Sequence, residues 1–493
     1  MLLLGIDIGT SSVKVSVVDA LSQKVIATSH YPEHESPIIS KQPGWAEQPP
    51  ETWWEDLQKA IIICNQTKLY NPLDIGAIGI AYQMHGLVLV DKSQTLLRDS
   101  IIWCDSRAVQ IGDKAFQTIG EDLCLTHLLN SPGNFTAAKL AWVKEYEPEL
   151  YEKIEKIMLP GDYIAMKLTG EITTSVSALS EGIFYDFVNK QLSEHILNYF
   201  GFHKSLFPEI KEVFSDHGRL SAKVALTLGL TPNIPVSYKA GDQPNNALSL
   251  NVLNPGEVAA TAGTSGVIYA VNNQLVFDKQ SRVNTFAHVN YNNKEIRTGV
   301  LLCINGTGSL NRWLKNTMGN TLSYQQMNDL GSEAPIGSQG LSVLPFGNGA
   351  ERMLNNKLIG AQFMNIDLNL HTQAHIIRAS QEGIAFAFRY GLDIMRQNWI
   401  IPKVIKAGKA NLFLSKLFTE SFVNITGIPV ELYNNDGSVG AALGAGIGAG
   451  IFSSAREAFN NTKAVELIEP SHQNLESAYK SWKNALQNQL ATN

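Results

Sequence analysis

Two copies of the tripeptide Gly-Thr-Ser, each set between runs of β-branched residues, constrain the fold of this chain more than any other feature. The first lies in LLLGIDIGTSSVKVSVVD, which begins at Leu2, and the second lies in EVAATAGTSGVIYAV, which begins at Glu257. In the first stretch, valines alternate with polar residues from position 13 to position 17, which is strand periodicity. Both stretches therefore predict a hairpin with a polar tip, the first over residues 2–8 and 13–18 and the second over residues 257–271.

A single Gly-Thr-Ser turn is ordinary, because glycine supplies positive φ and the hydroxyls bond nearby backbone. Two copies in matching settings indicate a repeat of the whole arrangement. The other predicted elements are a strand pair around a Gln-Met-His-Gly turn (77–90), helices (137–168), a strand (234–240), a turn (241–246), a short helix (247–253), a helix (374–397), strands near 404 and at 429–433, and a glycine-rich helix from 439. We divide the chain into residues 1–246 and 247–493, two related α/β halves with a cleft between them.

Composition narrows the class of protein. The 493 residues carry 39 basic and 45 acidic side chains without a block of either sign, which argues against nucleic acid or an anionic membrane as partner. The four cysteines show no spacing typical of metal ligands, so we expect neither a zinc site nor disulfides, and a cytoplasmic protein. Residues 439–452 are too few to span a bilayer, and the N-terminus lacks the features of a signal peptide. A small-molecule ligand is the better expectation.

The two turns are candidate phosphate sites, because backbone N–H groups and small hydroxyls at such turns form concave sets of donors. If the two turns face each other across a cleft, they could bind one polyphosphate between them. The residues concerned are Gly9, Thr10, Ser11 and Ser12 in the first turn, and Gly263, Thr264 and Ser265 in the second.

Two aspartates stand beside these turns. Asp7 lies within an apolar strand, where a carboxylate needs a partner; a hydrated divalent cation would supply one, and capping of its own turn is the alternative. Asp242 follows a predicted strand at the seam between the halves, where catalytic groups often lie. Capping of the helix ahead of Ala247 explains Asp242 equally well.

Three further stretches hold polar groups at predicted strand ends or turns. Gln83, Met84 and His85 precede a glycine, although a lone histidine is more often structural. Asp105 and Arg107 have an ion pair as their simple explanation, and the three tryptophans of residues 44–54 are typical of a core or a domain edge. The glycine-rich residues 434–450 do not fit the GxGxxG register of a dinucleotide site. Close packing of a helix N-terminus onto a flat group such as adenine is one interpretation, and helix–helix packing through small residues is the simpler one.

With these residues assembled, the chain resembles the FGGY carbohydrate kinases over nearly its whole length. The resemblance lies in eight stretches that follow one another in the order of that family: GIDIGTSSVKV, GWAEQPPETWW, GIAYQMHG, IIWCDSRA, GNFTAAKLAWVKEYEPE, LPGDYIAMKLTGE, AGDQPNNAL and ATAGTSGV. Each alone is weak, but eight in order are specific. The QMHG turn and the tryptophan-rich segment favour the members that phosphorylate D-xylulose over those that phosphorylate glycerol.

The resemblance implies two actin-like (ribonuclease H-like) domains with an interdomain catalytic cleft, the first binding sugar and the second nucleotide. It also implies ATP and Mg²⁺ as cofactors, a ketopentose as substrate, and leaves a homodimer open. Asp242 would be the base, Asp7 would bind Mg²⁺ through water, and both turns would hold phosphates. Gln83, Met84, His85, Asp242 and Gln243 would contact the sugar, and Gly408 and Asn411 would contact the nucleotide. With an ordinary pKa of about 3.9, Asp242 would be ionised at neutral pH and would need placement more than tuning.

The chain departs from the family pattern at two places. Residues 406–411 read KAGKAN where the family commonly has GGGARS, which puts the adenine contacts in question, and residues 350–354 read AERML where the family has GERTP. Other substrates of the same fold, namely ribulose, fuculose, gluconate and glycerol, remain alternatives. A non-enzymatic actin-like ATP switch is a further alternative, and it would have no reason to place Asp242 and His85 together.

Overall fold

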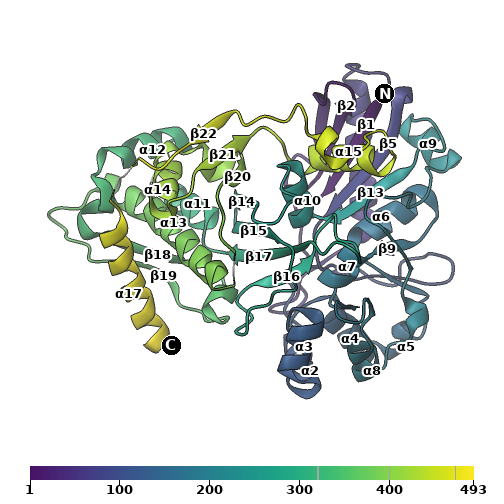
Figure 1. Ribbon diagram of the computed structural model, residues 1–493, viewed down its shortest axis with the longest axis horizontal. Helices are drawn as coiled ribbons and strands as arrows, with labels where there is room; N and C mark the ends of the chain where they lie inside the picture. The colour runs from purple at the N-terminus through teal and green to yellow at the C-terminus, as the bar shows by residue number, and fades with distance from the viewer. Residues whose placement is uncertain (319–320, 399, 472–473, 493) are drawn as a thin grey trace.

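The hairpin predicted at the start of the chain begins the first of two large sheets (Figure 1). The computed structural model describes residues 1–318, 321–398, 400–471 and 474–492. In sheet order, the first sheet consists of β13 (Val236–Gly241), β5 (Ile75–Tyr82), β1 (Leu2–Ile8), β2 (Val13–Asp19) and β3 (Val25–Tyr31). Strands β1, β2 and β3 are antiparallel, whereas β5 and β13 continue the sheet parallel to β1.

The second sheet repeats this arrangement around the second hairpin. In sheet order it consists of β16 (Asn284–Ala287), β17 (Thr298–Ile304), β15 (Gly266–Asn272), β14 (Val258–Ala262), β20 (Ile405–Gly408), β21 (Val430–Tyr433) and β22 (Glu466–Ile468). Strands β17, β15 and β14 are antiparallel, and β20 and β21 continue parallel to β14. The two hairpins and the repeated α/β organisation are therefore confirmed.

Helices cover the sheets of both halves. In the first half, α1 (Pro50–Gln66) packs on β2 and β3, and α6 (Pro160–Thr169) packs on β5 and β13. In the second half, α13 (Gln373–Gln397) packs against α12 (Tyr324–Glu333) and α14 (Lys416–Thr426). In the described part of the chain, the other helices of eight or more residues are α2 (Val109–Ile119), α3 (Glu121–Leu128), α4 (Thr136–Tyr146), α10 (Asp242–Ser249), α11 (Gly308–Met318), α15 (Gly437–Gly448) and α17 (Glu476–Thr492). Two shorter helices of the first half are α7 (Val176–Glu181) and α8 (Glu194–Phe200).

One helix of the second half belongs spatially to the first sheet. The glycine-rich α15 (Gly437–Gly448) lies against β1, β5 and β13, as its yellow ribbon beside the purple strands shows in Figure 1. The approach is close: a Cβ on Gly5 would lie 1.8 Å from the Ser438 carbonyl oxygen, and one on Gly79 would lie 2.0 Å from that of Ala441. On the helix itself, a Cβ on Gly440 would lie 2.6 Å from Ser249 Cβ of α10, and one on Gly448 would lie 1.8 Å from the Ser237 carbonyl oxygen of β13. The predicted packing of this helix through small residues is therefore confirmed, against strands as well as against another helix.

The structure corrects the strand pair expected over residues 77–90. Strand β5 pairs with β1 and β13 rather than with β6 (Val88–Val90), which pairs with β8 (Lys156–Met158). Both edges of β5 are occupied, so the Gln-Met-His-Gly turn leads the chain out of the sheet. Strand β8 also interrupts the helices expected over residues 137–168.

A second correction concerns residues 241–253. The predicted turn at 241–246 is the first part of α10, which runs from Asp242 to Ser249 instead of from 247 to 253. Pro244 lies in the first turn of this helix, where proline is tolerated because no intrahelical N–H bond is lost. Asn246, at which we divide the chain, lies within this helix.

The interpretations of the tryptophans as core residues and of Asp105 and Arg107 as an ion pair are confirmed. Trp53 and Trp54 are buried core residues, and the four cysteines form no disulfide. Asp105 and Arg107 form an ion pair of 2.7 Å, and the Arg107 guanidinium stacks 3.8 Å from the centroid of Trp45. Among the described residues, no helix combines the length and the apolar composition that crossing a bilayer would need.

Candidate active site

The first-half candidates converge at one edge of the first sheet. Asp7, Ala81 and Ala240 occupy one row across the parallel strands β1, β5 and β13. Because parallel strands end at the same edge, the chain segments that follow them meet there. These segments are the Gly-Thr-Ser-Ser turn after β1, residues 83–85 after β5, and Asp242 after β13.

Asp242 is the first residue of α10 and retains part of its surface exposed. Gly241 is the N-cap of this helix, so Asp242 does not cap a helix that begins at Ala247. Burial, and next the charge of Asp7, raise its pKa from 3.8 to about 7, while a 3.2 Å hydrogen bond from Gln243 Nε2 to its Oδ2 opposes the shift. The expectation that Asp242 has an ordinary pKa is therefore wrong, because burial and the charge of Asp7 raise that pKa.

Asp7 faces the start of α15. A Cβ on Gly437 would lie 2.3 Å from Asp7 Oδ2, and Asn245 of α10 donates from Nδ2 to the Gly437 carbonyl at 2.8 Å. Burial and then the charge of Asp436 raise the pKa of Asp7 to about 6, against the lowering effect of Lys14. Asp436 caps α15 by accepting from the N–H groups of Ser438 and Val439. Asp7 thus has unfavourable charge interactions with Asp436 and with Asp242, and a carboxylate in this position suits a divalent cation, which takes oxygen ligands.

The side chain of Gln83 ties strand ends together. Its Oε1 accepts from Thr10 Oγ1 at 3.1 Å, and its Nε2 donates to Gln48 Oε1 at 3.1 Å. Met84 is buried against Gly241, where a Cβ would lie 2.6 Å from Met84 Cγ. Gln83 thus braces the first turn, and Met84 forms an apolar wall beside Asp242.

His85 is held at a left-handed backbone position, with φ of 63°. Its carbonyl accepts from Lys139 Nζ at 2.9 Å and from Thr136 Oγ1 at 3.2 Å, and its Nδ1 lies 3.0 Å from the Glu181 carbonyl oxygen. Burial, and next the charge of Lys139, lower the pKa of His85 to about 3. The imidazole is therefore neutral at physiological pH, and its ring contacts Phe286 of the second half with centroids 5.5 Å apart.

Glu181 was not singled out from the sequence. Only 1% of it is exposed, and a Cβ on Gly241 would lie 2.5 Å from its Oε2, so it lies beside the residue that precedes Asp242. Burial and the charge of Asp242 raise its pKa well above the usual range. Glu181 is the last residue of α7, which is distant in sequence from the strand ends of the first sheet, so no local pattern links it to the site. Lys139 lies within α4, which is also distant in sequence from these strand ends.

The first turn is braced from several sides. Gly9 N–H donates to the Ser12 carbonyl at 3.1 Å, and Gln48 Nε2 donates to the Thr10 carbonyl at 2.8 Å. Trp103 Nε1 donates to Thr10 Oγ1 at 3.0 Å although the tryptophan is 49% exposed. Ser11 is exposed at the tip of the turn.

The second turn opens into a pocket of about 530 Å³ in the second half. Gly263 and Thr264 line it, and their carbonyls accept from Gly308 and Ser309 at the start of α11. Asn411 lines it too, and a Cβ on Gly263 would lie 3.5 Å from Asn411 Nδ2. The volume lies within the usual range for small-molecule sites. Two residues expected here from the sequence, Ser265 and Gly408, do not line the pocket. Five polar or aromatic residues that the sequence analysis did not single out do line it: Asn311, Arg312, Tyr324, Gln325 and Asn328.

Residues 350–354, the AERML segment, lie where the two halves of the chain meet. Glu351 accepts from the N–H groups of Asn305 and Gly306 at 3.0 and 3.1 Å. Arg352 donates to Asn284 Oδ1 at 2.7 Å and lies 5.5 Å from the ring centroid of Phe135 in the first half. This segment thus contacts both halves of the chain.

Comparison with known proteins finds similar domains, sequences and folds. The models of the FGGY family of carbohydrate kinases match residues 2–249 with the N-terminal domain and residues 258–450 with the C-terminal domain. Xylulose kinase of Haemophilus influenzae is 30% identical over 403 residues, 80% of each chain. The structure of xylulose kinase from Rhodospirillum rubrum superposes with a TM-score of 0.86 at 24% identity, covering 99% of both chains. Plasmodium falciparum glycerol kinase with ADP superposes at 0.88 and 20% identity, covering 99% of this chain and 98% of that one.

Proposed function

This chain belongs to the FGGY family of carbohydrate kinases, and we propose that it transfers the γ-phosphoryl group of ATP to D-xylulose, giving D-xylulose 5-phosphate. The family membership makes it a phosphotransferase that uses ATP and a sugar. Relatives named xylulose kinase at 27–30% identity over most of the chain support the ketopentose. We assign sugar binding to residues 1–246 and nucleotide binding to residues 247–493.

The observation that carries the proposal is the convergence of Asp242, Asp7 and His85 at the ends of three adjacent strands. An ATP switch needs phosphate turns and a cation site, but it has no use for a base with a pKa of about 7 beside a neutral histidine. A kinase that deprotonates a sugar hydroxyl uses both.

In the proposed reaction, Asp242 accepts the proton of the terminal sugar hydroxyl as that oxygen bonds to the γ-phosphorus. The bond from the γ-phosphorus to the bridging oxygen breaks, and ADP departs. Phosphoryl transfer passes through a loose transition state, so alignment and charge neutralisation contribute more than deprotonation. The neutral His85 ring would bond a sugar hydroxyl through Nε2, Met84 would form the apolar wall of the sugar site, and Gln243 would orient Asp242.

We assign the Mg²⁺ site to the first half and the nucleotide contacts to the two turns and the pocket beside the second turn. Asp7 would hold Mg²⁺ through water, and the cation would neutralise charge on the phosphates. The N–H groups and hydroxyls of both turns would bind phosphate oxygens, with Asn411 at the pocket beside the second turn. Gly9 N–H and Thr10 Oγ1 would exchange their present acceptors, the Ser12 carbonyl and Gln83 Oε1, for phosphate oxygens. The KAGKAN segment lacks the family's glycine run, so we assign the base-binding surface to the pocket residues, Tyr324 among them. We further propose a cytoplasmic enzyme, with a homodimer as the assembly to test.

The decisive experiment is an assay of ADP release with D-xylulose against ribulose, fuculose, gluconate and glycerol, each with a control lacking acceptor. We expect the highest kcat/KM with D-xylulose and little ADP without sugar. A higher kcat/KM with another acceptor would replace the substrate and retain the kinase. ATP hydrolysis that no acceptor stimulates would instead favour the ATP switch.

A further inference from the structure

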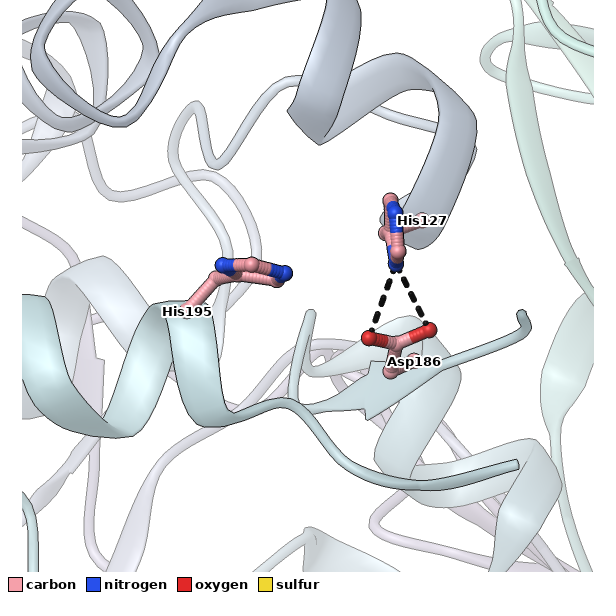
Figure 2. Close-up of side chains that lie close together, drawn as sticks. All are labelled: His127, Asp186 and His195. Atoms are coloured by element: carbon pink, nitrogen blue, oxygen red, sulfur yellow. Dashed lines mark hydrogen bonds and ion pairs between the residues drawn. The ribbon is translucent and has the colours of Figure 1, made fainter. Parts of the chain in front are cut away.

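A second cluster of chemically active side chains lies in the first half, apart from the strand ends that carry Asp7 and Asp242. His127 comes from the last turn of α3, Asp186 from β10 (Tyr185–Asp186), and His195 from the first turn of α8. Figure 2 shows His127 and Asp186 facing each other, with the ring of His195 extended toward them. One potential ligand atom from each residue lies within 4.8 Å of the other two.

The distances suit a metal ion bound by nitrogen and oxygen. His127 Nδ1 lies 2.9 Å from Asp186 Oδ2 and 3.0 Å from Oδ1. Zinc bonds of 2.0–2.1 Å in a tetrahedron separate the ligand atoms by about 3.3 Å, so this pair needs little adjustment. His195 has to close the remaining distance. Its side chain is only partly buried, which leaves it room to rotate, and it meets His127 edge to face at 5.1 Å between centroids.

The carboxylate is fixed in the way that a ligand requires. Asp186 is 1% exposed; its Oδ1 accepts from the N–H groups of Val188 and Asn189, and Asn189 Nδ2 donates to its Oδ2 at 2.9 Å. Burial acts to raise the pKa of Asp186, but the hydrogen bonds from Asn189 and His127 lower it overall. Supporting bonds of this kind orient ligands at metal sites and contribute 10- to 100-fold to affinity. The side of Oδ2 that now contacts His127 Nδ1 is the one that would face the metal.

An ion pair between His127 and Asp186 would explain those two residues without a metal, but it leaves His195 unexplained. Within the described part of the chain, His195 forms no hydrogen bond, and its ring nitrogens are not committed elsewhere. Three elements separated in sequence thus present two imidazoles and one oriented carboxylate to one point. Sequence spacing gave no sign of the cluster, because the three residues are dispersed over positions 127–195.

We propose that His127, Asp186 and His195 bind a divalent transition metal of the Zn²⁺ class. The metal takes the place of the proton between His127 Nδ1 and Asp186: from an imidazolium that proton leaves to solvent, and in a neutral imidazole the ring takes its Nε2–H tautomer, so that Nδ1 is a neutral ligand in either case. Imidazole ligands select Zn²⁺, Co²⁺, Ni²⁺ or Cu²⁺, whereas Mg²⁺ prefers an all-oxygen shell, so this site is distinct from the cation of the kinase reaction. Bound metal would fasten α3, β10 and α8 together.

The test uses the untagged full chain after treatment with a chelator, without sugar or nucleotide. Titration with Zn²⁺ followed by calorimetry should show one tight site, and Co²⁺ should give the visible absorption of a tetrahedral complex. Zn²⁺ should raise the melting temperature, and excess Mg²⁺ should not displace it. His195→Gln, which leaves the His127–Asp186 pair in place, should weaken Zn²⁺ binding at least tenfold.

Two matched variants make the result decisive. His34→Gln removes an exposed histidine elsewhere and should leave Zn²⁺ affinity unchanged. His371→Gln disrupts another histidine pair, whose ring centroids are 5.4 Å apart, and should also leave it unchanged. Absence of tight Zn²⁺ binding by the unaltered chain would overturn the proposal. Equal affinity in the His195→Gln and His34→Gln proteins, or loss only in His371→Gln, would do the same.

Discussion

At the scale of single residues, Asp242 sets the pH at which the proposed enzyme works. Burial and the charge of Asp7 raise its pKa to about 7, and a base acts only when deprotonated. Activity should therefore be full above pH 7 and lost as the pH falls through that value. We expect kcat/KM for D-xylulose to fall by about tenfold per pH unit on the acid side, as general-base catalysis predicts. A profile from pH 5 to 9 at saturating Mg²⁺–ATP measures this.

The matched variant is Asp242→Asn, which keeps the size of the side chain. General-base assistance is worth roughly 10²- to 10⁴-fold, so kcat should fall by that range while nucleotide affinity changes little. The residual activity should lose its dependence on a group that titrates near pH 7. Near-normal turnover in this variant would remove Asp242 from the role of base.

Sequence patterns located residues that follow strands better than residues that approach from elsewhere. Asp7, His85 and Asp242 were predicted because each lies directly beside a strand with clear periodicity. Burial and the charge of Asp436 raise the pKa of Asp7, and burial and the charge of Asp242 raise the pKa of Glu181. Both Asp436 and Glu181 come from segments that are distant in sequence from these strands. The shift of Asp242 was missed for the same reason, since it results from tertiary burial. No spacing rule reports which side chains a fold buries together.

At the scale of elements, hairpins were predicted well because alternation and a turn sequence are local. The pairing of β5 was not, because parallel partners are set by distant strands. Likewise α15 has a simple local pattern, but its place on the first sheet depends on Gly5 and Gly79. Its glycines become informative only when the facing strands are known.

This contact gives a prediction for Gly79→Ala. The added Cβ would lie 2.0 Å from the Ala441 carbonyl oxygen, and neither backbone can yield easily. Overpacking of this kind costs about 1–3 kcal/mol, and displacement of α15 would also move Asp436 from Asp7. We expect a lower urea midpoint together with lower kcat.

Gly76→Ala is the matched control, since it lies in the same strand and its Cβ would meet the flexible side chain of Met1. We expect its urea midpoint and kcat to stay near those of the unaltered protein. Equal stability of the two variants would mean that α15 does not pack against β5 as described.

At the scale of the whole molecule, one edge strand joins the two halves. One edge of β16 pairs with β17, and its other side bonds to first-half residues. Asn130 exchanges two hydrogen bonds with the Thr285 backbone, at 2.7 and 3.0 Å. Ser177 Oγ donates to the Ala287 carbonyl, and Ala287 N–H donates to Ser180 Oγ, each at 2.9 Å. The candidate base and the nucleotide pocket belong to different halves, so motion about this seam would change the distance between them.

We therefore predict that the halves close when both substrates bind, because closure would exclude water from the γ-phosphate and complete the site. Small-angle scattering should give a radius of gyration near the roughly 23 Å expected for a compact chain of 493 residues, and a smaller value with D-xylulose plus a non-hydrolysable ATP analogue. Asp242→Asn should compact as the unaltered chain does, because it loses the base and keeps the binding surfaces. An unchanged radius at demonstrated saturation by both ligands would show that the described arrangement is already the catalytic one, and that protection from water comes from the site itself.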